Sequence, residues 1–216
     1  MKKGILISFE GLDKVGKSTQ VELLHKHLKK NKILPVVVRE PGSTESSEKI
    51  REILADRSLV GKIAPLTEFL LYSAGRAQLV AEIIKPAIER GEVVISDRYY
   101  DSSAAYQGYG RGIDRRFIDR VNKVATQRLV PDLTILLVAD GAVMNSKSNI
   151  KRFTPDLFDD RLEREFLEFR KKVQAGYLKI AEKEADRFLV VDASEKKADI
   201  AAKIAARVDR LLEETD

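Results

Sequence analysis

The sequence predicts an α/β fold in which helices cover a mostly parallel sheet. Short apolar runs alternate along the chain with longer segments of helical period, as in proteins built from strand–helix–strand units. The apolar runs are continuous rather than interleaved with polar residues, which is typical of strands buried on both faces. The 216 residues correspond to a single domain, residues 1–216, which is large enough to fold without a disulfide or a structural metal.

Five apolar runs are predicted to be strands: 4–9, 33–39, 93–96, 133–138 and 188–192. Helical period predicts the helices 17–30, 45–55, 66–90, 115–128, 161–184 and a final one that buries Ile200, Ile204, Val208 and Leu211. Pro65 and Gly91 mark the two ends of the helix 66–90, and Asp114 is suited to cap the next helix. The apolar stripe of the helix 161–184, which includes Val173 and Tyr177, is interpreted as core.

The composition excludes several classes of protein. The absence of cysteine excludes a disulfide scaffold, a cysteine-ligated zinc site and a cysteine nucleophile. The two histidines, His25 and His27, are interpreted as helix-surface residues. The 39 basic and 34 acidic residues are spread evenly, so no tail for nucleic acid is expected. No apolar run is long enough to span a membrane and no signal peptide is evident, so we expect a cytoplasmic enzyme.

The strongest motif is a phosphate-binding loop (P-loop) of the form G-x-x-x-x-G-K-[ST]. It reads Gly11-Leu12-Asp13-Lys14-Val15-Gly16-Lys17-Ser18, followed by Thr19. An apolar strand precedes it and an amphipathic helix follows, which is the context in which the motif binds phosphate. The glycines allow a tight turn whose amides face the anion, and the helix adds its positive end.

The P-loop predicts that the chain binds ATP or GTP together with Mg²⁺. Lys17 can reach the β and γ phosphates, Ser18 can ligate Mg²⁺, and Thr19 can contact the α phosphate. A GTPase is disfavoured because Asn122-Lys123 is not followed by the aspartate that reads guanine. The short chain favours a small kinase.

Further polar residues follow the second and third predicted strands. Arg39 and Glu40 come after the second, and Asp97 and Arg98 come directly after the third. Open α/β sheets bind ligands at the carboxyl ends of their strands, so these arginines are predicted to bind phosphate. A salt bridge from Arg39 to Glu40 or Asp97 is the structural alternative.

With these motifs the sequence resembles the thymidylate kinase family, whose members phosphorylate dTMP to dTDP. The resemblance extends from residue 5 to about residue 192. It rests on the segments 9–20, 39–46, 76–80, 96–112, 130–137 and 160–181, of which SDRYYDSSAAYQGYGRG (96–112) is the most specific. The resemblance implies a three-layer P-loop kinase fold whose five parallel strands have the order 2-3-1-4-5, flanked by helices and carrying a mobile lid.

The resemblance also implies a role for each matching residue. Arg98 would bridge the acceptor phosphate and the γ-phosphoryl group, and Asp97 would organise Mg²⁺ and its waters with Ser18. Tyr72 would stack on the base from the place where the family usually has a phenylalanine. Arg39 and Arg51 would lie near the dTMP phosphate, and Asp13 and Glu40 near the sugar 3′-hydroxyl and the phosphate-binding groups. Arg76 would hydrogen-bond the thymine carbonyl, and Ser103, Tyr106 and Gln107 would read the base edge. The full set implied for dTMP is Asp13, Arg39, Glu40, Arg51, Tyr72, Arg76, Arg98, Ser103, Tyr106 and Gln107, with ATP as the phosphoryl donor.

The segment 140–160 departs most from the family pattern. It lacks periodicity and is expected to be the lid loop. The catalytic basic residue is either Lys14 in the P-loop or one in the lid, where Arg152 and Arg161 are favoured because arginine binds phosphate in bidentate fashion.

Two alternatives to the dTMP kinase remain open. The chain could be a kinase for another nucleotide or a nucleoside, or a nucleotide-binding protein with an impaired lid. The resemblance further implies a homodimer, for which the stripes at 69–80 and 114–128 are available. Neither nucleic acid nor a membrane is expected as a partner.

Overall fold

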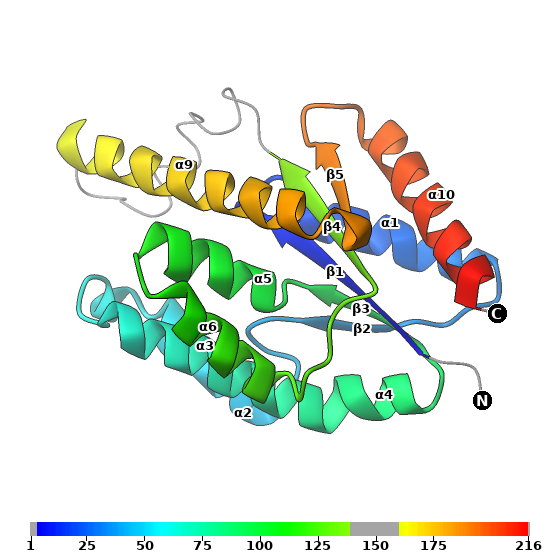
Figure 1. Ribbon diagram of the computed structural model, residues 1–216, viewed down its shortest axis with the longest axis horizontal. Coiled ribbons are helices and arrows are strands. Elements are labelled where there is room, and N and C mark those ends of the chain that lie inside the picture. Colours follow the sequence, from blue (N-terminus) through cyan, green and yellow to red (C-terminus); the bar gives the residue numbers. More distant parts are fainter. Residues whose placement is uncertain (1–3, 139–159, 216) are drawn as a thin grey trace.

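A five-stranded parallel sheet forms the centre of the chain (Figure 1). Its strands are β1 (Ile5–Gly11), β2 (Val36–Arg39), β3 (Val93–Asp97), β4 (Leu133–Val138) and β5 (Phe188–Asp192). The order is β2-β3-β1-β4-β5, and every neighbouring pair is parallel. The predicted fold class, strand order and five strand positions are therefore confirmed.

The computed structural model describes residues 4–138 and 160–215, without the side chains of 160–166. Its main helices are α1 (Lys17–Lys30), α2 (Glu45–Ala55), α3 (Pro65–Leu79), α4 (Lys85–Glu89), α5 (Tyr100–Ser103), α6 (Arg115–Ala125), α9 (Asp160–Lys183) and α10 (Lys197–Thr215). Within the described residues, the other elements are two π-helical segments, Val80–Ile84 and Ala104–Gly110, and two short 3₁₀ turns, Arg57–Leu59 and Ala185–Arg187. Helices lie on both sides of the sheet, as a three-layer fold requires (Figure 1).

The two faces of the sheet bury separate hydrophobic clusters. On β1, Ile5 and Ile7 belong to a large cluster with the apolar faces of α1, α9 and α10, whereas Leu6 packs in a smaller cluster with Leu79 and Ile84. Successive strand residues point to opposite faces, so a strand covered on both sides is apolar at most of its positions. This explains the unbroken apolar runs of the sequence.

Several local predictions are confirmed and others need correction. Pro65 occupies the first turn of α3, and the Asp114 side chain caps α6 by accepting from Phe117 N at 2.8 Å. The helix predicted over 115–128 ends at Ala125, because the chain then turns through left-handed residues 127 and 128. His27 is not a plain surface residue, since it is half-buried against Asp209 at 2.8 Å and joins α1 to α10.

The largest correction concerns residues 100–110, for which no helix is predicted. They form α5 and the π-helical segment that follows it. Serine, tyrosine and glycine dominate this stretch, and its apolar residues show no helical period, so propensity gives no signal. Within the described ranges, 4–138 and 160–215, no helix is both long enough and apolar enough to cross a membrane.

Candidate active site

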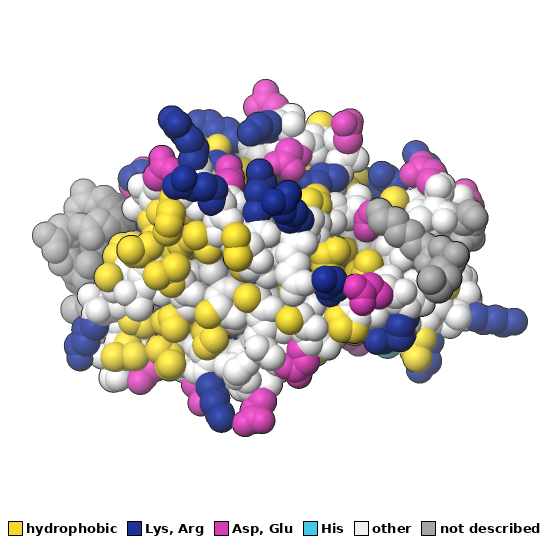
Figure 2. All heavy atoms as spheres, turned by 60° about the horizontal axis from the view of Figure 1, so that its bottom comes forward, with side chains coloured by type: hydrophobic (Ala, Val, Ile, Leu, Met, Phe, Trp, Pro, Cys, Tyr) yellow, Lys and Arg dark blue, Asp and Glu magenta, His cyan; other side chains and the backbone are white. Residues whose placement is uncertain are grey.

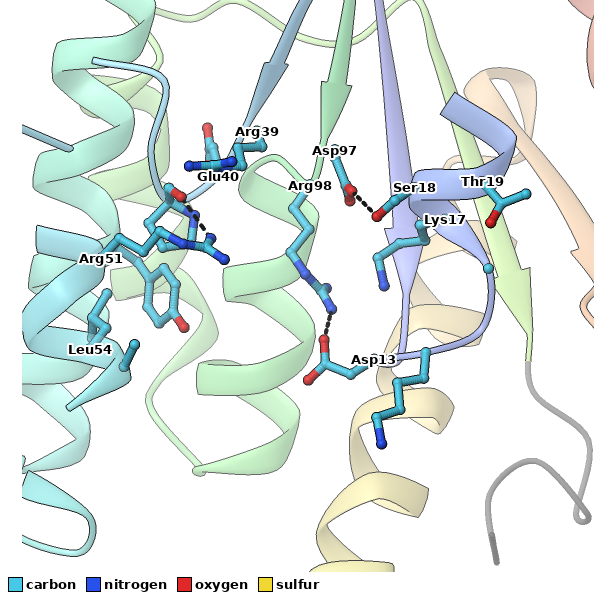
Figure 3. A pocket seen from close by; sticks show the side chains of 15 residues that line it. Asp13, Lys17, Ser18, Thr19, Arg39, Glu40, Arg51, Leu54, Asp97 and Arg98 are labelled. Carbon is cyan, nitrogen blue, oxygen red and sulfur yellow. Dashed lines mark hydrogen bonds and ion pairs between the residues drawn. The ribbon is translucent and has the colours of Figure 1, made fainter. Parts of the chain in front are cut away.

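A cavity of about 750 Å³ opens at the carboxyl ends of β1, β2 and β3. This is the edge at which open α/β sheets bind ligands. In Figure 3, Arg98 lies between Lys17 and Ser18 on one side and Arg39 and Arg51 on the other. The cavity is lined by Asp13, Lys14, Gly16, Lys17, Ser18, Thr19, Arg39, Glu40, Pro41, Arg51, Leu54, Ala55, Tyr72, Asp97 and Arg98.

The P-loop joins β1 to α1 through backbone that favours glycine. Gly16 has φ +98°, and no side-chain cap satisfies the first amides of the helix that starts at Lys17. These N–H groups and the helix dipole are available to an anion. A Cβ on Gly11, which has φ +131°, would collide with the Leu137 carbonyl oxygen of the neighbouring strand. Both glycines are therefore required, as the motif predicts.

Lys17 lies under the P-loop rather than in solvent. Its Nζ donates to Leu12 O at 2.7 Å and to Gly11 O at 3.2 Å. Burial, reinforced by the nearby Arg98 charge, lowers the pKa of Lys17 to about 7. A phosphate at this position would favour the charged lysine, so binding of the anion and protonation of Lys17 are linked.

Ser18 and Asp97 meet beside the P-loop. The Ser18 hydroxyl donates to Asp97 Oδ2 at 2.8 Å (Figure 3). A hydroxyl and a carboxylate are hard oxygen ligands, and Mg²⁺ takes only one or two protein ligands when phosphates and waters complete its shell. The two residues predicted for the metal thus fit Mg²⁺. Among residues 4–138 and 167–215, no group of three or more acidic, histidine or cysteine side chains offers a fuller cage.

Arg98 is held by contacts on both of its terminal nitrogens. Nη2 donates to Asp13 Oδ1 at 2.5 Å (Figure 3), and Nη1 donates to Gly11 O at 3.0 Å. The guanidinium also lies over the Tyr106 ring, 5.2 Å from its centroid. Burial acts in the opposite direction, but the charges of Arg98 and Lys17 lower the pKa of Asp13. An ionised carboxylate therefore faces the arginine that is predicted to bridge the two phosphates.

The far side of the cavity carries the other two predicted phosphate-binding arginines. Arg39 pairs with Glu48 at 2.8 Å, which is neither of the partners considered for it from the sequence. Arg51 donates to Pro41 O at 3.0 Å. Tyr72 is half-buried and lines the cavity, as its predicted stacking role requires.

Arg76, which is predicted to read the thymine carbonyl, does not line the cavity. Its side chain is only 1% exposed and donates to Glu40 Oε2 at 2.8 Å, Asn122 Oδ1 at 3.0 Å and Ser103 Oγ at 3.1 Å. The guanidinium and Glu40 form a buried ion pair beneath the cavity. The structure therefore brings Arg76, Glu40 and Ser103 together, with Glu40 alone of the three on the cavity wall.

The other two residues predicted to contact the base lie next to the cavity but do not line it. Gln107 donates to Glu68 Oε1 at 2.7 Å, and Tyr106 Oη accepts from Arg98 at 3.4 Å. Of the lid residues, Arg152 and the loop 140–159 lie outside the described residues, as does the side chain of Arg161. Lys14 is exposed on the cavity wall.

The site also includes residues to which sequence reasoning gave no role. Glu10 is fully buried and accepts from Ser102 Oγ at 2.6 Å and Tyr177 Oη at 2.8 Å, and both hydroxyls also accept from Arg98. Tyr177 is core, as predicted, but its hydroxyl belongs to the site. The available signal was Glu10 itself, since a carboxylate at the end of an otherwise apolar buried strand needs partners.

Comparison with known proteins points to one family. The family model described as thymidylate kinase matches residues 9–204. The thymidylate kinase of Leifsonia xyli is 47% identical over 96% of both chains, and that of Caldanaerobacter subterraneus subsp. tengcongensis is 46% identical over 88% of both.

A solved structure agrees with the sequence relatives. Thymidylate kinase from Ehrlichia chaffeensis superposes with a TM-score of 0.75 and 29% identity, covering 96% of this chain and 99% of that one. The family model spans most of this chain, and the relatives match it over nearly their full lengths. The chain therefore belongs to the thymidylate kinase family, phosphotransferases that convert dTMP to dTDP with ATP.

Proposed function

We propose that this chain carries out the family reaction in the cavity around Arg98, with the ATP phosphates on the P-loop and the dTMP phosphate towards Arg39. The observation that carries this assignment is the position of Arg98 between two sets of phosphate-binding groups (Figure 3). A guanidinium there can donate to both anions at once, because its nitrogens present N–H groups in a fixed fork.

The reaction needs charge neutralisation more than proton transfer. A dTMP phosphate oxygen attacks the γ phosphorus of ATP in line, and the bond from that phosphorus to the β-phosphate oxygen breaks as ADP leaves. The attacking oxygen is already anionic at neutral pH, so no strong general base is required. Lys17 and Arg98 neutralise the charge that spreads over the equatorial oxygens.

Arg98 must exchange its carboxylate partner for phosphate during the cycle. In the structure Asp13 Oδ1 accepts a hydrogen bond from Arg98 Nη2, and the Asp13 side chain is about half exposed. A partly exposed ion pair is only weakly favourable, so substrate phosphates can displace it. Asp13 is then available to the sugar 3′-hydroxyl or to the phosphate-binding groups, the position that the family resemblance gives it.

We assign Mg²⁺ to Ser18 and Asp97, whose oxygens lie 2.8 Å apart beside the P-loop. When bound, Mg²⁺ neutralises the charge of the β and γ phosphates. At the other end of the cavity, Tyr72 lies where it can stack on thymine, and Arg76 supports the pocket through Glu40 and Ser103.

We also propose that the chain forms a homodimer. Phe69 and Leu79 are fully buried within the chain, but α3 also exposes Leu66 and Leu70, 48% and 45% respectively. Figure 2 shows hydrophobic side chains gathered over the face that carries α2, α3 and α6. A second copy would cover this apolar face, since large exposed patches mark interaction sites.

The experiment that tests the proposed function is an ADP-release assay across a panel of nucleoside monophosphates. Turnover should be highest with dTMP and should depend on both ATP and Mg²⁺. Lys17→Met is the control, because it removes the P-loop charge and should abolish turnover without altering the far side of the cavity. No turnover with dTMP at any concentration would refute the assignment.

A further inference from the structure

Glu10 is a fully buried carboxylate near the reacting groups that takes no part in charge neutralisation or phosphoryl transfer. It is the penultimate residue of β1 and is 0% exposed. Its Oε1 accepts from Tyr99 N at 2.7 Å, and its Oε2 accepts from Ser102 Oγ at 2.6 Å and Tyr177 Oη at 2.8 Å. Three donors on one buried carboxylate satisfy it well enough to keep it inside the protein.

The two hydroxyls on Glu10 are also acceptors for Arg98. Arg98 Nη1 lies 3.0 Å from Ser102 Oγ and 3.3 Å from Tyr177 Oη. A hydroxyl has one proton, so a hydroxyl that donates to Glu10 must turn lone pairs towards the guanidinium. The hydroxyls also lie 2.9 Å from each other, but an ionised carboxylate is the stronger acceptor.

Glu10 also holds the backbone that carries Arg98. Arg98 has φ +74°, in the left-handed region that residues other than glycine seldom adopt. Arg98 N donates to Phe9 O at 3.0 Å, and the next amide, Tyr99 N, donates to Glu10. Phe9 and Glu10, consecutive residues of β1, thus hold the backbone turn at Arg98. Glu10 also orders the contacts of the Arg98 side chain.

We propose that Glu10 is a positioning residue for Arg98: its carboxylate takes the protons of Ser102 and Tyr177 and thereby presents both hydroxyl oxygens to the guanidinium. The proposal rests on the role given to Arg98 in the proposed function. It concerns how that arginine is held in place, not a direct contact of Glu10 with substrate.

The protonation state of Glu10 sets the direction of this network. Burial, then the charge of Asp101 on α5, raise the pKa of Glu10 to about 7, while Arg98 opposes them. Tyr177 on α9, Lys17 on α1 and Tyr100 on α5 are further titratable groups that interact with it. Because Tyr99 N occupies Oε1, an added proton would sit on Oε2 and point at a hydroxyl, which would then turn its own proton towards Arg98.

Glu10→Gln tests this proposal directly. Glutamine keeps the shape of the side chain but places an NH₂ donor where Glu10 has the acceptor Oε2. Its carbonyl oxygen must still accept from Tyr99 N, so its NH₂ group faces Ser102 and Tyr177 and forces both to accept. We expect kcat to fall at least about tenfold, in proportion to the loss of hydrogen bonds to a charged group. KM for ATP should stay near the wild-type value, because the P-loop is unchanged.

The pH profile of kcat separates this role from a purely structural one. In the wild type, kcat should fall as pH decreases through about 7, where Glu10 becomes protonated. In Glu10→Gln that decrease should be absent, and kcat should fall only at about pH 6, where the dTMP phosphate is protonated. Tyr177→Phe is the matched control, because it removes one hydroxyl but leaves Glu10 ionisable. Tyr177→Phe should show the same decrease of kcat through about pH 7 as the wild type, with a smaller overall loss of kcat. A Glu10→Gln variant that still shows the wild-type decrease through about pH 7 would overturn the proposal.

A measurement without substrate keeps the two proposals separable. The ¹⁵N resonances of the Arg98 guanidinium, assigned with Arg98→Lys, should shift in Glu10→Gln and shift less in Tyr177→Phe. Unchanged Arg98 resonances in Glu10→Gln would overturn the role of Glu10 whatever the activity. If the Arg98 resonances shift in Glu10→Gln but the wild-type chain does not phosphorylate dTMP, the proposed function is refuted instead.

Discussion

Replacing Arg76 with methionine should destabilise the protein more than any exposed arginine substitution. The side chains of Arg76 and Glu40 are 1% and 4% exposed, and their charged atoms are 2.8 Å apart. Removing one partner of a buried ion pair costs about 3–5 kcal/mol, because the other charge stays buried and unpaired. Asn122 Oδ1 and Ser103 Oγ lose their donor as well, so we expect a value of about 4 kcal/mol.

Thermal and urea unfolding provide the assay. With roughly 2 cal/mol/K of unfolding entropy per residue, 4 kcal/mol corresponds to a fall in Tm of about 9 °C for a domain of this size. Arg90→Met is the matched control, since Arg90 pairs with Glu92 at 2.8 Å but on the surface, and Tm should barely change. Equal losses in the two variants would refute the reasoning.

The pH dependence of the same variant has a defined sign. Burial raises the pKa of Glu40 even beside Arg76. Without Arg76 the pKa of Glu40 in the folded protein rises further above its value in the unfolded chain. The folded state then binds the Glu40 proton more tightly, so this contribution to stability is present at low pH and is lost as pH rises. Arg76→Met should therefore lose less stability at pH 5.5 than at pH 8. Adding Glu40→Leu should recover part of the loss at pH 8, because an apolar pair can replace a buried ion pair.

Three further predictions concern the phosphate site. Pyrophosphate binding at pH 8 should be accompanied by uptake of a proton at Lys17. Calorimetry in buffers of different ionisation enthalpy measures this uptake, which should be smaller for Lys17→Arg because the arginine stays charged. Ser18→Ala should raise the Mg²⁺ concentration needed for half-maximal velocity several-fold with KM for dTMP unchanged, and an unchanged Mg²⁺ requirement would exclude Ser18 as a ligand. Among Lys14→Ala, Arg152→Ala and Arg161→Ala, we expect the largest fall in kcat from an arginine variant, and near-native kcat in both would move the role to Lys14.

Most of the fold could be predicted because strands and helices left strong patterns. Continuous apolar runs located all five strands, and Pro65 and Asp114 marked helix ends that the structure confirms. The helical stretch 100–110 could not be predicted, because burial against α9 rather than local propensity stabilises it. Within it, Gly110 packs so closely on Phe169 and Val173 that a Cβ would clash.

The cavity wall was predictable because its residues follow strand ends in short motifs. The pairing of these residues was not predictable, because each partner comes from elsewhere in the chain. Arg39 pairs with Glu48 of the next helix, and Asp101 with Arg187, 86 residues later. Arg76 is an example: the resemblance gives it a ligand role, and the structure adds a buried ion pair with Glu40, 36 residues earlier, that no local pattern signals.

The most direct test of the account is a crystal structure of this chain with ADP, Mg²⁺ and dTMP. We expect the β phosphate of ADP on Lys17, and the dTMP phosphate within about 3 Å of nitrogens of both Arg98 and Arg39. Arg98 should then have exchanged Asp13 for phosphate. A dTMP phosphate bound away from Arg98, with the Asp13 pair intact, would contradict the central claim that Arg98 joins the two phosphate sites.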